Sequence, residues 1–356
     1  GRFMGVSKTD FGVTRDGRKA SLYTIINKNG MEAVVSDFGA ILVKLIVPNK
    51  DGEKADVVLG FDHLEQYEEN PNFFGSEGRR SANRIGGAAF QIDGVTYHLT
   101  ANENENNLHS DFYHGFHKVL WNADMKDREN AVVFSYNSPD GENGFPGNLK
   151  ISVTYTLKND NSLQISYDGI SDKKTIINMT NHSYFNLAGC ASGSIHDHVL
   201  TVEADAVTSV ADNTLIPTGG YTPVAGTPFD MRHGLRLGDG LNATHSCPQM
   251  TFAGGYDHNC VLRKGEAMGL AARLYDPKSG RVMETLTDQP GVQVYTACGT
   301  DIPGGKGGTH YGKYCAVCLE TQHFPDSPNH PQFIGTTVLR PGEKYDTTTI
   351  YAFRTE

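Results

Sequence analysis

The sequence predicts an all-β protein, a large sandwich of antiparallel sheets with only a few short helices. Short runs rich in β-branched and aromatic residues recur along the chain, separated by Gly, Asn and Asp. No segment has the sustained 3.6-residue apolar repeat of an amphipathic helix. Neither a shift in composition nor a fixed-period repeat divides the chain, so we expect residues 1–356 to form a single domain.

The individual elements follow from local patterns. Strands are predicted at 33–36, 40–47, 131–136, 149–157, 162–168, 199–202, 293–296 and 316–321. Tight turns are predicted where glycine follows Asn or Asp, at 28–30, 50–52, 92–94 and 139–141. Residues 156–162 are typical of a hairpin connection. One short helix is expected over 62–69, with Asp62 as its N-cap.

Composition narrows the classes of partner. A formal net charge of -10 argues against nucleic acid, which would favour a basic face, and against an anionic membrane surface. No apolar run approaches the roughly 20 residues that span a bilayer. Residues 1–3, which precede Met4, are interpreted as a cloning remnant, and no secretory signal is recognised. A neutral substrate is compatible with such a surface, and we expect a cytoplasmic protein.

The cysteine and histidine motifs are weak indicators of chemistry. The six cysteines form no dense disulfide framework, which favours a reducing compartment. Cys315 and Cys318 form a C-x-x-C within a predicted strand, where residues three apart face opposite sides, so we interpret both as core residues. His196 and His198 can share one face of a strand, but a lone H-x-H is poor evidence for a metal.

Familiar cofactor motifs are missing. The glycine-rich run 304–308 contains a lysine but lacks the Walker spacing and the Ser or Thr that should follow. No G-x-G-x-x-G follows a strand, which argues against a nicotinamide or flavin enzyme, and no G-x-S-x-G elbow supports a hydrolase. We therefore expect neither a cofactor nor a metal.

Two segments carry polar side chains where a strand should be apolar. In extended geometry His182, Tyr184 and Asn186 share one face, which is typical of the wall of a wet pocket. Glu320 ends an apolar run, where a carboxylate is costly to bury without partners. Taken alone, Glu320 is also compatible with a surface position at the end of a strand. Together with His182 it makes a candidate acid–base pair.

Other polar residues suit the recognition of hydroxyl groups. Arg84, which follows Asn83, can donate to hydroxyl or ring oxygens, and Asp257 can accept from sugar hydroxyls. His109 and Gln293 lie in similar polar contexts. The rings of Tyr184, Phe185 and Trp121 suit the apolar face of a pyranose, although each is equally compatible with the core.

Ordered blocks along nearly the whole chain resemble the galactose mutarotase, or aldose 1-epimerase, family. No single block is specific, but their order and spacing are. The blocks lie at 34–40, 58–61, 82–85, 107–109, 121, 181–189, 215–219, 255–259, 289–293, 318–322 and 339–343.

The resemblance implies a β-supersandwich fold and a function. It implies interconversion of the α and β anomers of free aldohexoses such as galactose and glucose, with no cofactor. It implies that His182 is the general acid and Glu320 the general base. It also places six residues around the sugar: Asn83, Arg84, His109, Tyr184, Asp257 and Gln293. Monomer and homodimer both remain open.

Two positions depart from the family pattern. Arg79 precedes Arg80 where the family often has glycine. Ser110 follows His109 where glycine is common, and a longer stretch, 111–114, comes after it. We expect both departures to lie at the rim of the site and to affect the choice of sugar rather than the acid–base pair.

Two alternatives remain at this stage. A hexose-6-phosphate 1-epimerase would need cations aimed at the phosphate, which Arg79, Arg80 and Arg84 can supply. A non-catalytic sugar-binding module would keep the polar contacts while losing the acid or the base. The presence of both His182 and Glu320 favours an enzyme.

Overall fold

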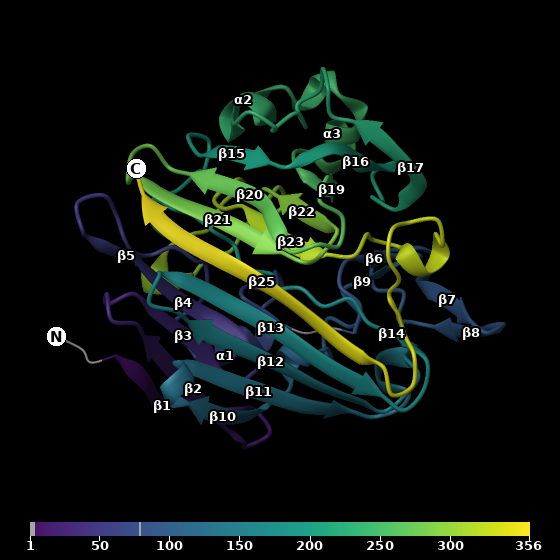
Figure 1. The fold of residues 1–356 in the computed structure, drawn as a ribbon, viewed down its shortest axis with the longest axis horizontal. Coiled ribbons are helices and arrows are strands. Elements are labelled where there is room, and N and C mark those ends of the chain that lie inside the picture. Colours follow the sequence, from purple (N-terminus) through teal and green to yellow (C-terminus); the bar gives the residue numbers. More distant parts are fainter. Residues whose placement is uncertain (1–3, 78–79) are drawn as a thin grey trace.

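The computed structural model describes residues 4–77 and 80–356 and confirms the all-β prediction (Figure 1). Residues 1–3, interpreted as a cloning remnant, and Arg79 lie outside the described residues. All pairs of named strands are antiparallel. Over the described ranges the α-helices are three and short: α1 (Leu64–Glu69), α2 (Leu237–Asn242) and α3 (Pro248–Ala253).

Three large sheets make up the fold. The first has five strands in chain order: β1 (Gly5–Val13), β2 (Lys19–Ile26), β3 (Glu32–Ser36), β4 (Ile41–Pro48) and β5 (Lys54–Asp56). The second has nine strands in the spatial order β10 (Asn122–Lys126), β11 (Ala131–Ser138), β12 (Leu149–Leu157), β13 (Ser162–Ser171), β25 (Lys344–Thr355), β21 (Arg281–Thr287), β20 (Gly269–Tyr275), β15 (Val199–Val202) and β18 (Leu235–Arg236).

The third sheet carries part of the candidate site. Its spatial order is β17 (Pro217–Pro223), β16 (Ala204–Val210), β19 (Asp257–Leu262), β22 (Gly291–Tyr295) and β23 (Cys318–Gln322). Three strand pairs complete the fold: β6 (Arg84–Ile85) with β9 (Asn107–Leu108), β7 (Ala89–Ile92) with β8 (Val95–His98), and β14 (Thr175–Ile176) with β24 (Val338–Leu339).

The main core joins all three large sheets. Its buried side chains include Ile25 of β2, Phe134 of β11, Leu319 of β23 and Tyr351 of β25. β12 buries alternate residues along its whole length, whereas β23, which carries Glu320, is buried at every position. Because the core continues from sheet to sheet, the strands that carry polar site residues are held from behind by apolar packing. In the described part of the chain, no helix is both long and apolar enough to cross a membrane.

The predicted strands are all present, with ends that shift by up to two or three residues. The strands predicted at 149–157 and 199–202 have the bounds of β12 and β15. The prediction missed β25, the longest strand, which runs in yellow through the middle of the nine-stranded sheet in Figure 1. Its Thr, Ile and Tyr residues alternate between buried and partly exposed positions, a signal that the sequence does contain.

The predicted turns are also present. Gly30, Gly52, Gly94 and Gly141 all have positive φ angles, from 78° to 84°, which glycine adopts without steric cost. The predicted hairpin joins β12 to β13, with Leu157 opposite Leu163. One detail of the helix prediction is wrong, because the N-cap of α1 is His63 rather than Asp62. Asp62 instead accepts a hydrogen bond from the backbone N–H of Gly307. Its carboxylate is therefore bound to a distant loop and does not cap the helix.

Candidate active site

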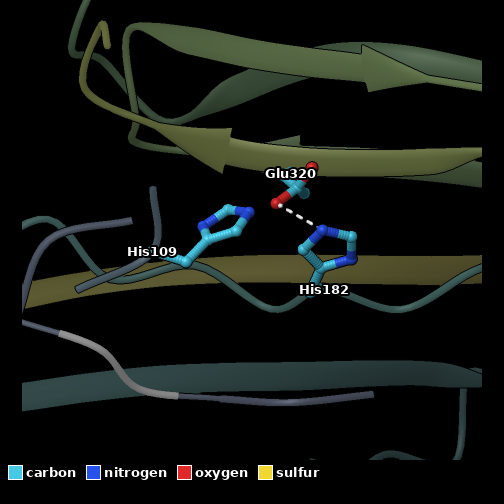
Figure 2. A group of neighbouring side chains, drawn as sticks. All are labelled: His109, His182 and Glu320. Atoms are coloured by element: carbon cyan, nitrogen blue, oxygen red, sulfur yellow. Dashed lines mark ion pairs between the residues drawn. The ribbon is translucent and has the colours of Figure 1, made fainter. Parts of the chain in front are cut away.

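A polar cavity of about 260 Å³ brings together most of the predicted site residues. Glu320 comes from β23, and His109 and His182 come from the segments that face it (Figure 2). The lining consists of Pro71, Asn72, Phe73, Asn83, Arg84, Glu103, Leu108, His109, Phe112, His182, Tyr184, Asp257, Tyr295 and Glu320. Seven of the eight predicted residues are therefore in the wall, and the eighth, Gln293, lies behind it.

His182 and Glu320 face each other in this wall. Nε2 of His182 is 3.5 Å from Oε1 of Glu320, and both side chains are almost fully buried (Figure 2). The backbone around His182 is fixed, because its N–H donates to the carbonyl of Ser76 and its carbonyl accepts from Gly75. The ring also stacks on Tyr184, with centroids 5.0 Å apart. An imidazole and a carboxylate thus face each other in one small polar cavity.

The hydrogen bonds of His109 determine its tautomer. The backbone N–H of Asn83 donates to Nδ1 of His109, at 2.9 Å, and the N–H of His109 donates to the carbonyl of Asn83, at 2.8 Å. A neutral imidazole has one donor and one acceptor nitrogen, so an accepting Nδ1 leaves the proton on Nε2. Both residues have left-handed backbones, with φ of 63° and 55°. Such strain outside glycine is typical of functional sites.

His109, His182 and Glu320 also make a geometric candidate for a metal site. Their ligand atoms all lie within 4.8 Å of one another. A metal on Nε2 of His109 would require the proton to move to Nδ1, where the Asn83 N–H already points. The hydrogen bonding of His109 therefore does not fit a metal ligand.

Arg84 is held among carboxylates. Its Nε is 2.7 Å from Oε1 of Glu103, and its Nη2 is 3.8 Å from Oδ2 of Asp257. Burial acts against the charged guanidinium, but Asp257, Glu103 and Glu320 together outweigh it and raise the pKa of Arg84. Burial has the opposite effect on Asp257: it raises the pKa of the carboxyl, although Arg84 and the hydrogen bond from Gln293 oppose the change.

A chain of amides supports Asp257 from behind. Gln293 donates to Oδ1 of Asp257 at 2.8 Å, and Gln322 donates to the carbonyl oxygen of the Gln293 side chain at 3.1 Å. Asn83 in turn donates to Gln322 at 3.4 Å. In this series of hydrogen bonds each amide donates toward Asp257. The series therefore fixes the orientation of the Asp257 carboxylate, which is its final acceptor. Gln293 thus supports a lining residue instead of forming the wall itself.

Some residues singled out from the sequence lie outside the cavity. Asn186 is fully buried and donates to the carbonyls of Gly193 and Cys315, so it does not share the pocket face with His182. Trp121 and Phe185 belong to the apolar core. The rings that do line the cavity besides Tyr184 are Phe73, Phe112 and Tyr295. Sequence reasoning missed these rings, because single aromatic residues carry no signal that separates a pocket wall from a core.

The structure describes only one of the two positions that depart from the family pattern. Arg79 lies outside the described residues, whereas Ser110 is buried and has a left-handed φ of 60°. The Ser110 hydroxyl accepts from the N–H of Ser81 and donates to its carbonyl. Ser110 is therefore not a rim residue, and the expectation that it lies at the rim is wrong. It ties the His109 segment to the segment that carries Arg84.

The cysteines and the two histidines of the H-x-H motif contact other protein groups. All six cysteines are free, and Sγ of Cys318 is 3.7 Å from Nδ1 of His182. Burial raises the pKa of the Cys318 thiol well above its ordinary value, so it stays neutral beside the imidazole. His198 is buried and accepts from the N–H of Leu187, while the ring of His196 packs on Tyr314. The two histidines of the H-x-H therefore have separate partners.

Known proteins resemble this chain over nearly its whole length. The aldose 1-epimerase family profile matches residues 21–352. Galactose mutarotase of Rattus norvegicus is 42% identical over 353 residues, 98% of this chain and 99% of its own. The Homo sapiens galactose mutarotase is 45% identical over 322 residues, 90% of each chain. Aldose 1-epimerase of Escherichia coli strain K12 is 35% identical over 343 residues, 96% of this chain and 97% of its own.

Solved structures have the same fold. The galactose 1-epimerase of Lactobacillus acidophilus NCFM superposes with a TM-score of 0.86 at 28% identity, covering 99% of both chains. An aldose epimerase homologue from C. elegans superposes with a TM-score of 0.84 at 31% identity, covering 94% of this chain and 99% of that one. The fold, the facing His182 and Glu320, and these relatives lead to one conclusion. The chain belongs to the aldose 1-epimerase family, whose members are isomerases acting on sugars.

Proposed function

We propose that the protein is a cytoplasmic aldose 1-epimerase, active as a monomer or homodimer, that interconverts the α and β anomers of free aldohexoses such as galactose and glucose. The observation that carries the proposal is the 3.5 Å separation between His182 Nε2 and Glu320 Oε1 in the cavity wall. The C1 hydroxyl and the ring oxygen of an aldose are bonded to the same carbon. A general base and a general acid that serve these two oxygens must therefore lie side by side.

The proposed reaction opens and recloses the ring. Ionised Glu320 removes the proton from the C1 hydroxyl, and protonated His182 gives a proton to the ring oxygen as the C1–O5 bond breaks. The product is the open-chain aldehyde. Rotation about C1–C2 exposes the other face of the carbonyl, and reclosure with the two proton transfers reversed yields the other anomer. Every proton returns to its donor, so the net reaction needs no redox partner.

The remaining site residues have proposed roles in binding. Asp257, oriented by Gln293, accepts from sugar hydroxyls, while Arg84 and the Nε2–H of His109 donate to sugar oxygens. The amide of Asn83 and the ring of Tyr184 complete the contacts. These roles suit an uncharged ligand with many hydroxyl groups.

The phosphorylated-hexose alternative has little support. Arg80 is buried away from the cavity and donates to the backbone carbonyls of Pro146 and Gly147, at 2.7 Å each. Arg84 is already paired with carboxylates. Of the three arginines that suggested a phosphate site, Arg80 therefore binds backbone carbonyls instead of facing the cavity. Arg79 lies outside the described residues.

One experiment tests the proposal and also distinguishes an enzyme from a non-catalytic sugar-binding module. Freshly dissolved α-galactose, α-glucose and α-glucose 6-phosphate are each followed by polarimetry with and without the purified chain. Accelerated mutarotation of the free sugars, with little effect on the phosphate, supports the proposal. Binding of galactose without any acceleration would instead identify a sugar-binding module.

A further inference from the structure

We propose that Glu103 makes the cavity select neutral over anionic hexoses, by holding the Arg84 guanidinium in an ion pair. The inference rests on the proposed function, since it concerns which sugars this cavity takes. Among the described lining residues, Arg84 is the only lysine or arginine. Glu103, Asp257 and Glu320 contribute three carboxyl groups to the same wall.

The ion pair uses two donors of the guanidinium. Arg84 donates from Nε to Oε1 of Glu103 at 2.7 Å and from Nη2 to Oε2 at 3.3 Å. The side chain of Arg84 is 10% exposed and that of Glu103 is 28% exposed, so solvent screens the pair only in part. A two-point contact of this kind fixes the plane of the guanidinium and occupies its Nε–Nη2 edge, one of the two edges that can bind a carboxylate or a phosphate at two points.

Glu103 is held in place by a tight turn. Its N–H donates to the carbonyl of Asn106 at 3.1 Å, and the N–H of Asn106 donates back to Glu103 at 2.9 Å. Asn104, inside the turn, has a left-handed φ of 54°. The next residues form β9, in which Leu108 pairs with Arg84 of β6. Because the turn and the strand pair together set Glu103 opposite Arg84, the ion pair belongs to the framework of the site.

The consequence for ligands follows from charge. An anionic group on a hexose would enter a wall in which the Arg84 guanidinium already faces two carboxylates, and it would meet repulsion from those carboxylates. A neutral hexose meets the same groups as hydrogen-bond donors and acceptors, with no such penalty. Glu103 itself has no place in the proton transfers of the proposed reaction, so its effect should fall on the choice of ligand.

The test compares glucose with glucuronate, which differ in charge at C6. Wild-type chain, Glu103→Gln and Glu105→Gln are assayed for kcat/KM by polarimetry and for dissociation constants by calorimetry with both sugars. Glu105 lies in the same turn and is exposed, so its substitution removes the same charge without touching the Arg84 pair. We expect the preference for glucose over glucuronate to fall about fivefold in Glu103→Gln, the scale of one partly exposed ion pair. We expect Glu105→Gln to keep the wild-type preference.

A second variant separates charge from shape. Glu103→Asp keeps the charge but shortens the side chain, so it should retain most of the preference for glucose. An unchanged preference in Glu103→Gln, or an equal loss in Glu105→Gln, would overturn the inference. If the wild type accelerates no mutarotation yet the binding preference shifts as expected, the proposed function fails and the selection by Glu103 stands. If the wild type accelerates mutarotation and the preference for glucose over glucuronate does not change in Glu103→Gln, the proposed function stands and the selection by Glu103 fails.

Discussion

The backbone N–H of Asn83 donates to Nδ1 of His109, and this one contact decides what His109 can do in the site. The proton of the neutral imidazole is left on Nε2, which faces the cavity beside Glu320 (Figure 2). His109 is therefore a hydrogen-bond donor toward a ligand. A proton on Nδ1 would instead point head to head at the Asn83 N–H, so Nδ1 is held as an acceptor.

His109 should tolerate glutamine better than asparagine. The amide nitrogen of a glutamine reaches about where Nε2 stands, whereas an asparagine reaches only to Nδ1. We expect kcat/KM for galactose to drop about 10- to 100-fold in His109→Ala, as for a lost hydrogen bond in a buried site. His109→Gln should recover part of that loss and His109→Asn little of it. Equal activity in the Gln and Asn variants would argue against the assigned tautomer.

The acid–base pair makes a stronger prediction. Glu320→Gln and His182→Ala should each lower kcat by about 10²–10⁴-fold in polarimetry, the usual contribution of a positioned proton donor or acceptor. Glu105→Gln and His245→Ala, which change exposed residues of the same types, serve as matched controls with wild-type rates expected. Near-normal turnover in either site variant would remove that residue from the mechanism.

The pH dependence of kcat/KM should be bell-shaped. Activity should rise with pH as Glu320 loses its proton and fall at higher pH as His182 loses its own. Asp257 contributes on the acid side, because burial raises the pKa of its carboxyl and it takes up a proton at a higher pH than an ordinary aspartate. The Asp257→Asn variant should thus show weaker sugar binding and an acid limb shifted to lower pH. A flat profile between about pH 4 and 9 would contradict the two-group mechanism.

Removing metals should leave the activity unchanged. His109 cannot ligate through Nε2 while Nδ1 accepts from Asn83, so the His109, His182 and Glu320 cluster does not fit a resident metal. Dialysis against EDTA should therefore not alter kcat/KM, and stoichiometric zinc should not raise it. Loss of activity on chelation, restored by one metal per chain, would show that the tautomer argument is wrong.

The buried histidine His198 should make the fold less stable in mild acid. Burial lowers the pKa of His198 from 6.5 to about 4 in the folded chain. Between these values the unfolded chain binds a proton that the folded chain does not, so the free energy of unfolding falls as pH falls from 6.5 toward 4. Thermal melts of the wild type should follow this decrease, and the slope should be shallower in His198→Gln. An identical slope in both would assign the acid sensitivity to other groups, such as His258, whose pKa is also lowered to about 4.

Local patterns in the sequence determined much of this protein. Alternating β-branched residues set the strands, and glycines after Asn or Asp set the turns, because both depend on interactions between near neighbours in the chain. The ordered polar blocks likewise identified the residues that gather at the cavity, among them His182 and Glu320. The helix cap at Asp62 was wrong because a distant loop, through Gly307, competes for that carboxylate.

Only the tertiary structure decided how those residues are paired. The sequence presents Arg80 and Arg84 as similar cations, yet one is buried against backbone carbonyls and the other faces the cavity. It does not reveal that Glu103 neutralises Arg84 or that Ser110 ties the His109 segment to Ser81. The physical reason is that a long polar side chain takes its partner from whichever segment packs beside it. That choice depends on contacts between loops far apart in the chain, which no local pattern encodes.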